Sequence, residues 1–238
     1  MRIRVINPNT TESMTALIAA SARAVAGPGT VVEAVTSAMG PASIESHYDE
    51  ALAVPGILAA LHDADGYVLA CFGDPGLDAA REVAAGPVVG LAEAAMHAAT
   101  MVGRGFSVVT TLSRTKGRAH DLAGRYVAAG ACRGVHACDI PVLDLESDPA
   151  ARKEVVALAR HALERDESDV IVLGCAGMAD FASAMSAELG VPVIDGVAAA
   201  TVLVQSLITL ELRTSTRGEY APPPAKRYSG LLQPFERT

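Results

Sequence analysis

The chain contains no tryptophan, only four cysteines and few aromatic residues, which make up 4% of its 238 residues. Charged residues are also sparse at 19%, and a net charge of −8 leaves no basic footprint for nucleic acid or anionic lipid. No apolar run approaches the roughly 20 residues that span a bilayer, and none at the N-terminus resembles a signal peptide. We therefore expect a cytoplasmic protein with a small-molecule partner, and neither a nucleic-acid nor a membrane partner.

Motifs for metals and common cofactors are missing as well. The cysteines show no C-x-x-C spacing, the histidines are scattered, and neither a G-x-G-x-x-G nor a Walker sequence occurs. The three lysines lie in charged helical or tail settings, which argues against a Schiff base with pyridoxal phosphate. We expect no metal and no cofactor, and in a reducing cytosol the cysteines should be thiols.

What the chain has in abundance is small and aliphatic side chains, since 50% of its residues are hydrophobic. Short β-branched runs end at polar residues or glycine and are followed by Ala-rich stretches, a pattern typical of βα units on a parallel sheet. The expected strands are residues 2–6, 30–35, 67–70, 87–89, 106–110, 135–138, 170–174 and 192–194. Helices are expected to begin near Thr11, Ala51, Gly76, Ala92, Ser113, Ala150, Met178 and Val197.

The second half of the chain repeats the first. Residues 65–73 (DGYVLACFG) align without a gap with residues 169–177 (DVIVLGCAG). This indicates an α/β fold of two pseudo-symmetric Rossmann-like domains with parallel sheets, and an active site in the cleft between them. We expect the first domain to comprise residues 1–100, completed by the C-terminal segment 205–238, and the second to comprise residues 101–204.

The alignment places Cys71 and Cys175 at equivalent strand ends, each before a small-residue turn and the start of a helix. A helix N-terminus favours the thiolate of a cysteine whose ordinary pKa is about 8.5. Inverting a carbon acid needs a base on one face and an acid on the other, which two opposed cysteines provide without a cofactor. A buried cysteine is more often a packing residue, and we assign Cys132 and Cys138 to that role.

Other residues near the expected cleft have two readings each. Asn9 follows the first strand, and Thr110 and Thr111 follow its counterpart in the second half, so their side chains either bind substrate or form turns and helix caps. Gly73 and Gly177 either bring backbone N–H groups close to an oxyanion or are ordinary turn residues.

Taken together, these residues resemble the hydantoin and allantoin racemases of the aspartate/glutamate racemase superfamily. The resemblance covers almost the whole chain. It depends on residues 5–10 (VINPNT), 41–51 (PASIESHYDEA), 70–76 (ACFGDPG), 90–96 (GLAEAAM), 172–178 (VLGCAGM) and 191–195 (VPVID). Residues 107–112, 139–144 and 226–230 look closer to the allantoin branch. Ser113 and Ser46 depart from the proline and glycine that relatives often carry.

The resemblance implies a cofactor-independent racemase of purine catabolism with Cys71 and Cys175 as its catalytic acid and base. It also implies that the substrate pocket is lined by Asn9, Ser43, Ile44, Phe72, Gly73, Thr110, Thr111, Ala176 and Gly177. Family members are usually homo-oligomers, so a tetramer or hexamer is expected.

Allantoin is the expected substrate, and racemisation of other 5-monosubstituted hydantoins is the alternative. A related decarboxylase would need only one of the two cysteines. A binding protein on the same scaffold would need neither.

Overall fold

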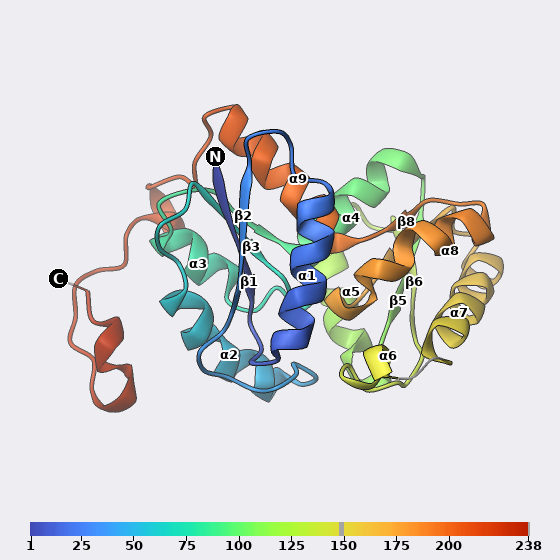
Figure 1. Cartoon of the computed structure of the whole chain (residues 1–238), viewed down its shortest axis with the longest axis horizontal. Coiled ribbons are helices and arrows are strands. Elements are labelled where there is room, and N and C mark those ends of the chain that lie inside the picture. Colours follow the sequence, from blue (N-terminus) through green and yellow to red (C-terminus); the bar gives the residue numbers. More distant parts are fainter. Residues whose placement is uncertain (148–149, 238) are drawn as a thin grey trace.

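The strands of the computed structural model, which describes residues 1–147 and 150–237, form two four-stranded parallel sheets (Figure 1). The first has the order β2-β1-β3-β4, and its strands are β1 (Arg2–Asn7), β2 (Val31–Thr36), β3 (Gly66–Leu69) and β4 (Val88–Gly90). The second has the order β6-β5-β7-β8, and its strands are β5 (Phe106–Thr110), β6 (Cys132–Ala137), β7 (Val170–Leu173) and β8 (Val193–Ile194). The equivalent orders confirm the predicted α/β fold of two similar halves.

The registers of the two sheets match as well. Ile6 pairs with Leu69 between β1 and β3, as Val109 pairs with Leu173 between β5 and β7. The next residue along the chain donates back to the neighbouring strand in each half, with N···O distances of 2.9 Å from Ala70 to Ile6 and 2.7 Å from Gly174 to Val109. Both cysteines therefore lie two residues beyond the last paired residue of the equivalent strand.

The helices follow the strands as the βα pattern requires. They are α1 (Glu12–Ala24), α2 (His47–Ala59), α3 (Leu77–Val83), α4 (Leu91–Val102), α5 (Lys116–Tyr126), α6 (Asp144–Ser147), α7 (Ala151–Asp166), α8 (Ala182–Leu189) and α9 (Gly196–Thr209). The 3-10 segments of the described residues are η1 (Ser113–Thr115), η2 (Ala176–Phe181), η3 (Gly218–Tyr220) and η4 (Gly230–Phe235). Among the described residues, no helix is both long and apolar enough to cross a membrane.

Several expected elements differ from the structure, among them the helix expected near Ser113, where the 3-10 segment η1 precedes α5. Helix α2 begins at His47 rather than near Ala51, because Ser46 caps it by accepting the Asp49 N–H at 3.1 Å. The α-helix expected near Met178 is wrong in type, since residues there form the 3-10 segment η2, in which Met178 N–H bonds the Cys175 carbonyl at 3.1 Å. Strand β6 starts three residues earlier than expected, and the short helix α6 is not among the expected helices.

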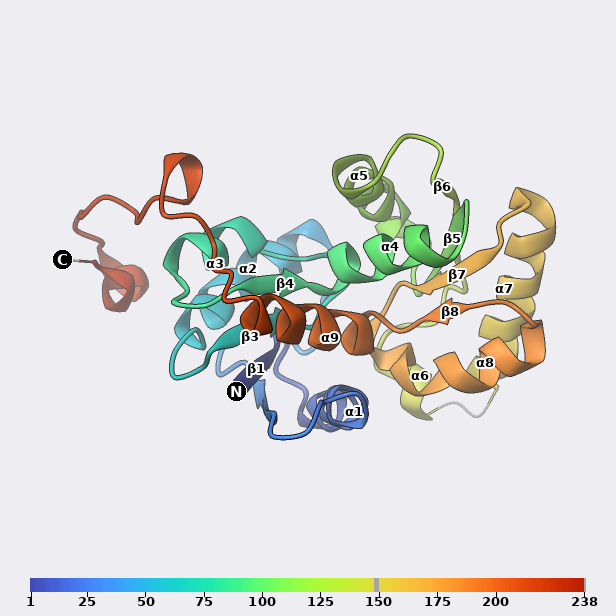
Figure 2. The same ribbon diagram turned by 90° about the horizontal axis from the view of Figure 1, so that it is seen from above.

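The two halves share one apolar core. The largest cluster of buried side chains contains Ile3 and Val68 from the first sheet, Phe106 and Val172 from the second, and Met96 of α4. Helix α4 contacts β7, and α9 crosses back to pack on β3 and β4, so these two helices run side by side through the middle of the molecule (Figure 2). The halves are therefore held as one packed unit around the groove between their strand ends.

The C-terminal segment leaves this core. Helix α9 runs through the domain boundary expected at residues 204 and 205, and the chain beyond it extends away from the first half (Figure 1). The Tyr220 hydroxyl donates to Asp78 at 2.9 Å and ties the start of the tail to α3, whereas Leu231 near its end is 96% exposed.

Candidate active site

A cavity of about 110 Å³ lies between the two halves, at the carboxyl ends of the parallel strands. The segments that follow β1, β3, β5 and β7 line it together with the N-terminal turns of α2 and α5. Its lining residues are Asn9, Met14, Ile44, Ser46, His47, Glu50, Ala70, Cys71, Phe72, Gly73, Thr110, Thr111, Arg114, Thr115, Arg118, Ala119, Val142, Gly174, Cys175 and Ala176. Both halves thus contribute to a single small-molecule pocket.

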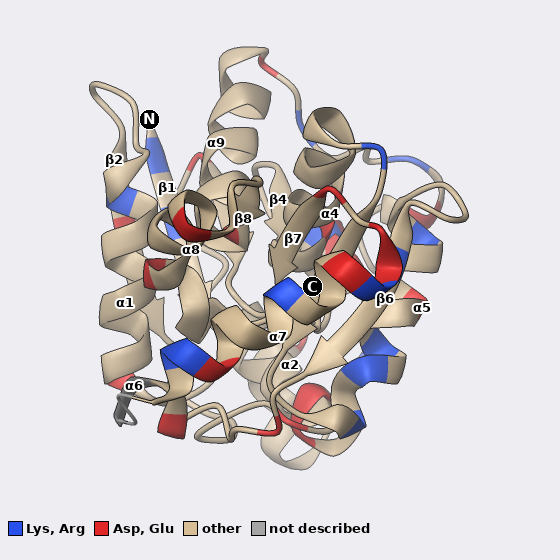
Figure 3. Cartoon of the chain, turned by 90° about the vertical axis from the view of Figure 1, so that its right-hand side faces the viewer, with Lys and Arg blue, Asp and Glu red and all other residues tan. Residues whose placement is uncertain are grey.

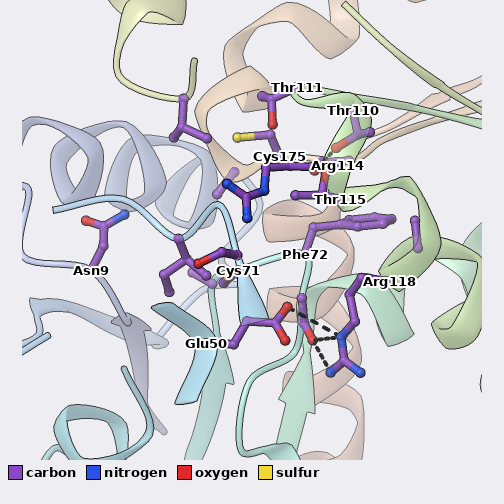
Figure 4. A pocket seen from close by; sticks show the side chains of 18 of the residues that line it. Asn9, Glu50, Cys71, Phe72, Thr110, Thr111, Arg114, Thr115, Arg118 and Cys175 are labelled. Carbon is purple, nitrogen blue, oxygen red and sulfur yellow. Dashed lines mark hydrogen bonds and ion pairs between the residues drawn. The ribbon is translucent and has the colours of Figure 1, made fainter. Parts of the chain in front are cut away.

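Cys71 and Cys175 enter this cavity from different sheets. In Figure 4 the two side chains lie on opposite sides of the Arg114 guanidinium. The turns that carry them begin alike, because the carbonyl of each cysteine accepts an N–H three residues later, from Asp74 at 3.0 Å and from Met178 at 3.1 Å. Neither cysteine is in a disulfide. The structure therefore brings the two sequence-predicted thiols to one pocket.

The Cys71 thiol is held in its protonated form. Removal from water raises its pKa to about 12, although a hydrogen bond from the Gly73 backbone lowers it. The nearby Cys175, Glu50 and Asp74 contribute to this raised pKa, since each carries or can acquire negative charge. The expectation that a helix N-terminus favours the thiolate is thus wrong for Cys71, because burial and neighbouring carboxylates outweigh the backbone donor.

The turn after Cys71 is anchored by a buried carboxylate. Asp74 accepts the N–H groups of Ala92 at 3.0 Å and Glu93 at 2.9 Å, and so caps the N-terminus of α4. Burial raises the pKa of Asp74 to about 7. Gly90 makes room for this carboxylate, since a Cβ atom there would lie 2.5 Å from its carboxyl carbon. The loop that presents Cys71 is therefore fixed to a core helix at its far end.

An ion pair forms one wall of the cavity and joins the two halves. Arg118 of α5 donates to the Gly73 carbonyl from Nη2 at 2.7 Å and from Nε at 3.1 Å, and its Nε lies 3.4 Å from Glu50 Oε1 of α2 (Figure 4). Sequence reasoning missed both residues. Glu50 falls inside one of the family-like segments, but Arg118 looks like any charged residue of a surface helix.

A second cation reaches the cavity from η1. The Arg114 side chain extends between the labelled cysteines in the view of Figure 4, and it makes no hydrogen bond or ion pair with the described residues. No motif in the sequence distinguishes Arg114 from the other charged residues. With Glu50, His47 and Arg118, it makes one side of the pocket strongly polar.

Seven of the nine expected substrate-binding residues line the cavity. They are Asn9, Ile44, Phe72, Gly73, Thr110, Thr111 and Ala176. The structure does not place Ser43 or Gly177 among the lining residues, and a Cβ atom on Gly177 would lie against the Cys175 sulfur, Leu145 and Met14 instead.

Some hydrogen-bonding atoms of the polar lining residues already have partners within the protein, and others do not. The Asn9 Oδ1 atom accepts from the Asn7 side chain and the Thr11 N–H, both at 2.9 Å, so this oxygen is already used in the turn that leads into α1. Its Nδ2 atom has the Met14 thioether sulfur as a partner at 3.0 Å, which is a weak acceptor. The Thr111 hydroxyl makes no hydrogen bond with the described residues. Asn9 Nδ2 and Thr111 Oγ1 are therefore uncharged side-chain donors that a ligand can use, in addition to the Arg114 guanidinium.

The remaining cysteines lie elsewhere. Cys132 and Cys138 flank the ends of β6 and approach the carbonyls of Gly134 at 3.7 Å and Thr111 at 3.6 Å. Burial raises the pKa of Cys132 to about 11.

Within residues 1–147 and 150–237, no cluster of three or more His, Cys, Asp or Glu residues could hold a metal ion.

The outer surface of the second half carries charges of both signs. On α7, arginines and a lysine alternate with glutamates and an aspartate, and Figure 3 shows both colours on this helix. Charges so interspersed largely cancel at a distance and are screened by salt. The field inside the pocket is therefore set by the groups that line it, above all Glu50, Arg114 and Arg118.

The fold and the pocket define a class of protein: an α/β protein of two matching parallel βα halves that brings one thiol from each half to a shared cavity. Residues 3–204 match the family model described as Asp/Glu/Hydantoin racemase. A hydantoin racemase from Pseudomonas sp. (strain NS671) is 44% identical over 243 aligned residues, which cover 100% of this chain and 98% of that protein.

Two solved structures are also similar. The allantoin racemase from Klebsiella pneumoniae has 50% identity and a TM-score of 0.97, with 100% of both chains covered. The allantoin racemase from Pseudomonas fluorescens has 38% identity and a TM-score of 0.93, covering 97% of this chain and 100% of that one. The chain therefore belongs to the Asp/Glu/hydantoin racemase family. It is a racemase, an enzyme of the isomerase class.

Proposed function

We propose that this racemase inverts C5 of a hydantoin ring, with allantoin as its preferred substrate, and that Cys71 and Cys175 are its acid and base. The observation that carries the proposal is the equivalent placement of the two cysteines, each two residues beyond a paired strand end and each lining the same cavity. A flat ring between them presents one face to each sulfur.

The proton balance of the reaction needs only these two groups. One sulfur, as thiolate, takes the C5 proton and becomes a thiol, while the electron pair passes into the adjacent carbonyl to give an enolate. The other sulfur, as thiol, delivers its proton to the opposite face of C5 and becomes a thiolate. The two protonation states have then exchanged, which readies the enzyme for the product enantiomer.

Donors on the cavity wall can hold the enolate oxygen during this transfer. The Asn9 amide and the Thr111 hydroxyl line the cavity with hydrogens that no strong protein acceptor uses. Donors already directed at the developing charge stabilise it without reorganisation. The same groups can bind the ring carbonyls in the ground state.

The preference for allantoin rests on the polar side of the pocket. Allantoin carries a ureido group at C5, which has several N–H donors and a carbonyl acceptor. Glu50 can accept such N–H groups, and Arg114, which has no partner among the described residues, can donate to the carbonyl. An aromatic substituent at C5 would leave the Arg114 guanidinium desolvated and without a ligand acceptor, which costs binding energy.

Circular dichroism of single enantiomers tests the function. Enantiopure allantoin and enantiopure 5-benzylhydantoin are incubated with the protein, each against an enzyme-free control that corrects for spontaneous racemisation. We expect loss of the signal for both allantoin enantiomers, with a higher kcat/KM for allantoin than for 5-benzylhydantoin. Faster racemisation of 5-benzylhydantoin would overturn the substrate preference, and no racemisation of either compound would overturn the proposed function.

A further inference from the structure

Arg118 links the two halves by bonding to the backbone of the turn that follows Cys71. The guanidinium starts from α5 in the second half and donates twice to the Gly73 carbonyl in the first half, at 2.7 and 3.1 Å. Glu50 Oε1 lies 3.4 Å from Nε of the same guanidinium. A planar fork held by a carbonyl and a carboxylate has little freedom to move.

The backbone of Gly73 connects Arg118 with Cys71. The backbone of Gly73 lowers the pKa of the Cys71 thiol, while its carbonyl accepts from Arg118. The Gly73 backbone lies close to α2, since a Cβ atom built on it would lie 2.5 Å from Glu50 Oε1. The position of the Cys71 sulfur therefore depends on where Arg118 holds the Gly73 turn.

Cys175 is held in a different way. The residues after it form the 3-10 segment η2, which packs on α1, α8 and α9. A Cβ atom on Gly177, the counterpart of Gly73, would meet the Cys175 sulfur, Leu145 and Met14 at 3.6 to 3.8 Å. The two otherwise equivalent turns thus differ: packing supports that of Cys175, and a charged side chain from the opposite half supports that of Cys71.

We propose that Arg118 is a positioning residue for Cys71 alone, fixing the Gly73 turn across the cavity while Glu50 holds the guanidinium in place. This inference deepens the proposed function and rests on it. It predicts that loss of Arg118 impairs proton transfer on the Cys71 face and leaves the Cys175 face nearly intact.

The charges around Cys71 allow a second measurement, of the pKa of this thiol. Glu50 of α2, Asp74 of the same loop and Cys175 of the second half all raise the pKa of Cys71. Arg118 of α5 offsets the charge of Glu50, and Arg114 of η1 faces the same cavity. Removing Arg118 should therefore raise the pKa of Cys71 further, whereas removing the charge of Glu50 should lower it.

The first test uses variants that keep one cysteine each. Arg118→Met, which retains the apolar stem, is combined with Cys175→Ser or with Cys71→Ser, and exchange of the C5 hydrogen of allantoin in D₂O is followed by NMR. We expect roughly 10-fold to 100-fold slower exchange where only Cys71 remains, because small misplacements of a reacting group cost this much. Where only Cys175 remains, the rate should change less than about 3-fold.

A matched control comes from the same helix. Arg125 also reaches across to the first half, where Nη2 contacts both carboxylate oxygens of Asp78 at 2.7 and 2.8 Å, but it does not line the cavity. Arg125→Met should leave exchange at its parental rate in both backgrounds. Equal slowing of both faces by Arg118→Met, or no slowing where only Cys71 remains, would overturn the proposal.

The second test does not require a racemase substrate. In the Cys175→Ser background, alkylation of Cys71 by iodoacetamide is followed by mass spectrometry as a function of pH. Arg118→Met should slow alkylation at pH 8, and Glu50→Gln should speed it. Changes of the same sign in both variants would overturn the proposal. If Arg118→Met does not fold by circular dichroism, Arg118→Gln takes its place, since its neutral amide also removes the positive charge and the guanidinium fork.

The two tests separate failure of the proposal from failure of the proposed function. If the protein does not act on hydantoins, the exchange experiment gives no signal in any variant, including the parent. The alkylation experiment still reports whether Arg118 and Glu50 act on Cys71 with opposite signs.

Discussion

A Cβ atom on Gly174 would lie 2.7 Å from the Cβ atom of Thr110. The two residues also share a hydrogen bond, from the Thr110 hydroxyl to the Gly174 carbonyl at 3.1 Å. This contact locks the end of β7 to the end of β5 directly before Cys175. The first half has Ala70 at the equivalent position, opposite Asn7, which is not branched at Cβ. The second half has a glycine there because the residue opposite it, Thr110, is branched at Cβ.

The contact predicts that Gly174→Ala destabilises the protein and lowers racemisation. The new methyl group meets a Cβ atom and a Cα atom that cannot rotate away, and such overpacking costs about 1–3 kcal/mol. Urea unfolding and kcat/KM measure the two effects.

Gly124→Ala is the matched control, because a Cβ atom there meets nothing within 4 Å and the residue lies in α5. It should be neutral or stabilising by up to about 1 kcal/mol. A Gly174→Ala variant as stable and active as this control would refute the steric account.

Features of this protein that depend on local or repeated sequence patterns can be predicted from the sequence, whereas features that depend on contacts between distant segments cannot. All eight strands could be placed from β-branched runs that end at glycine, proline or polar residues, because burial in a parallel sheet demands such runs. The internal repeat located Cys71 and Cys175, since equivalent strand ends must meet at the same cleft. These features are local or repeated, and so a single sequence carries them.

The missed features depend on tertiary contacts. Arg118 and Glu50 lie on helices whose charges look solvated, and only the packing of the two halves brings them together. The raised pKa of Cys71 likewise reflects burial and the proximity of Cys175 and Glu50, which come from other segments, together with Asp74, and these outweigh its local backbone donor. The 3-10 geometry after Cys175 is set by packing on α1 and α9, and its small residues do not distinguish it from an α-helix.

The buried Asp74 predicts a pH dependence of stability. An aspartate in the unfolded chain titrates near 3.9, whereas burial raises the pKa of Asp74 to about 7, so the folded state binds more protons between these values. The contribution of this group to stability is present below about pH 4 and is lost as the pH rises through 7, by roughly 1.4 kcal/mol for each unit of the shift.

Asp74→Asn should remove this loss, because the amide does not titrate. Urea unfolding of both proteins from pH 4 to pH 8 tests it. The stability of the parent relative to Asp74→Asn should fall across this range, and other carboxylates, which both proteins share, cancel in the difference. Parallel curves would show that Asp74 does not carry the raised pKa.

The proposed chemistry also predicts indifference to chelators. Proton transfer between two thiols and C5 needs no Lewis acid, so prolonged dialysis against EDTA should leave kcat/KM for allantoin unchanged, without added pyridoxal phosphate. The assay is circular dichroism before and after dialysis, with a metal-dependent enzyme treated alongside to show that the chelator acts. Loss of activity that returns with a divalent metal would contradict the two-thiol mechanism.

The measurement that tests the central claim most directly is exchange of the C5 hydrogen by each single-cysteine variant. Cys71→Ser and Cys175→Ser should both fail to racemise allantoin, because a serine hydroxyl is far too weak an acid to replace either thiol. The remaining cysteine can still remove a proton and return a deuteron on its own face. NMR in D₂O, corrected for spontaneous exchange, should therefore show each variant exchanging one enantiomer, and the two variants should select opposite enantiomers. Exchange of the same enantiomer by both variants, or parental racemisation by either, would contradict the assignment of one cysteine to each face.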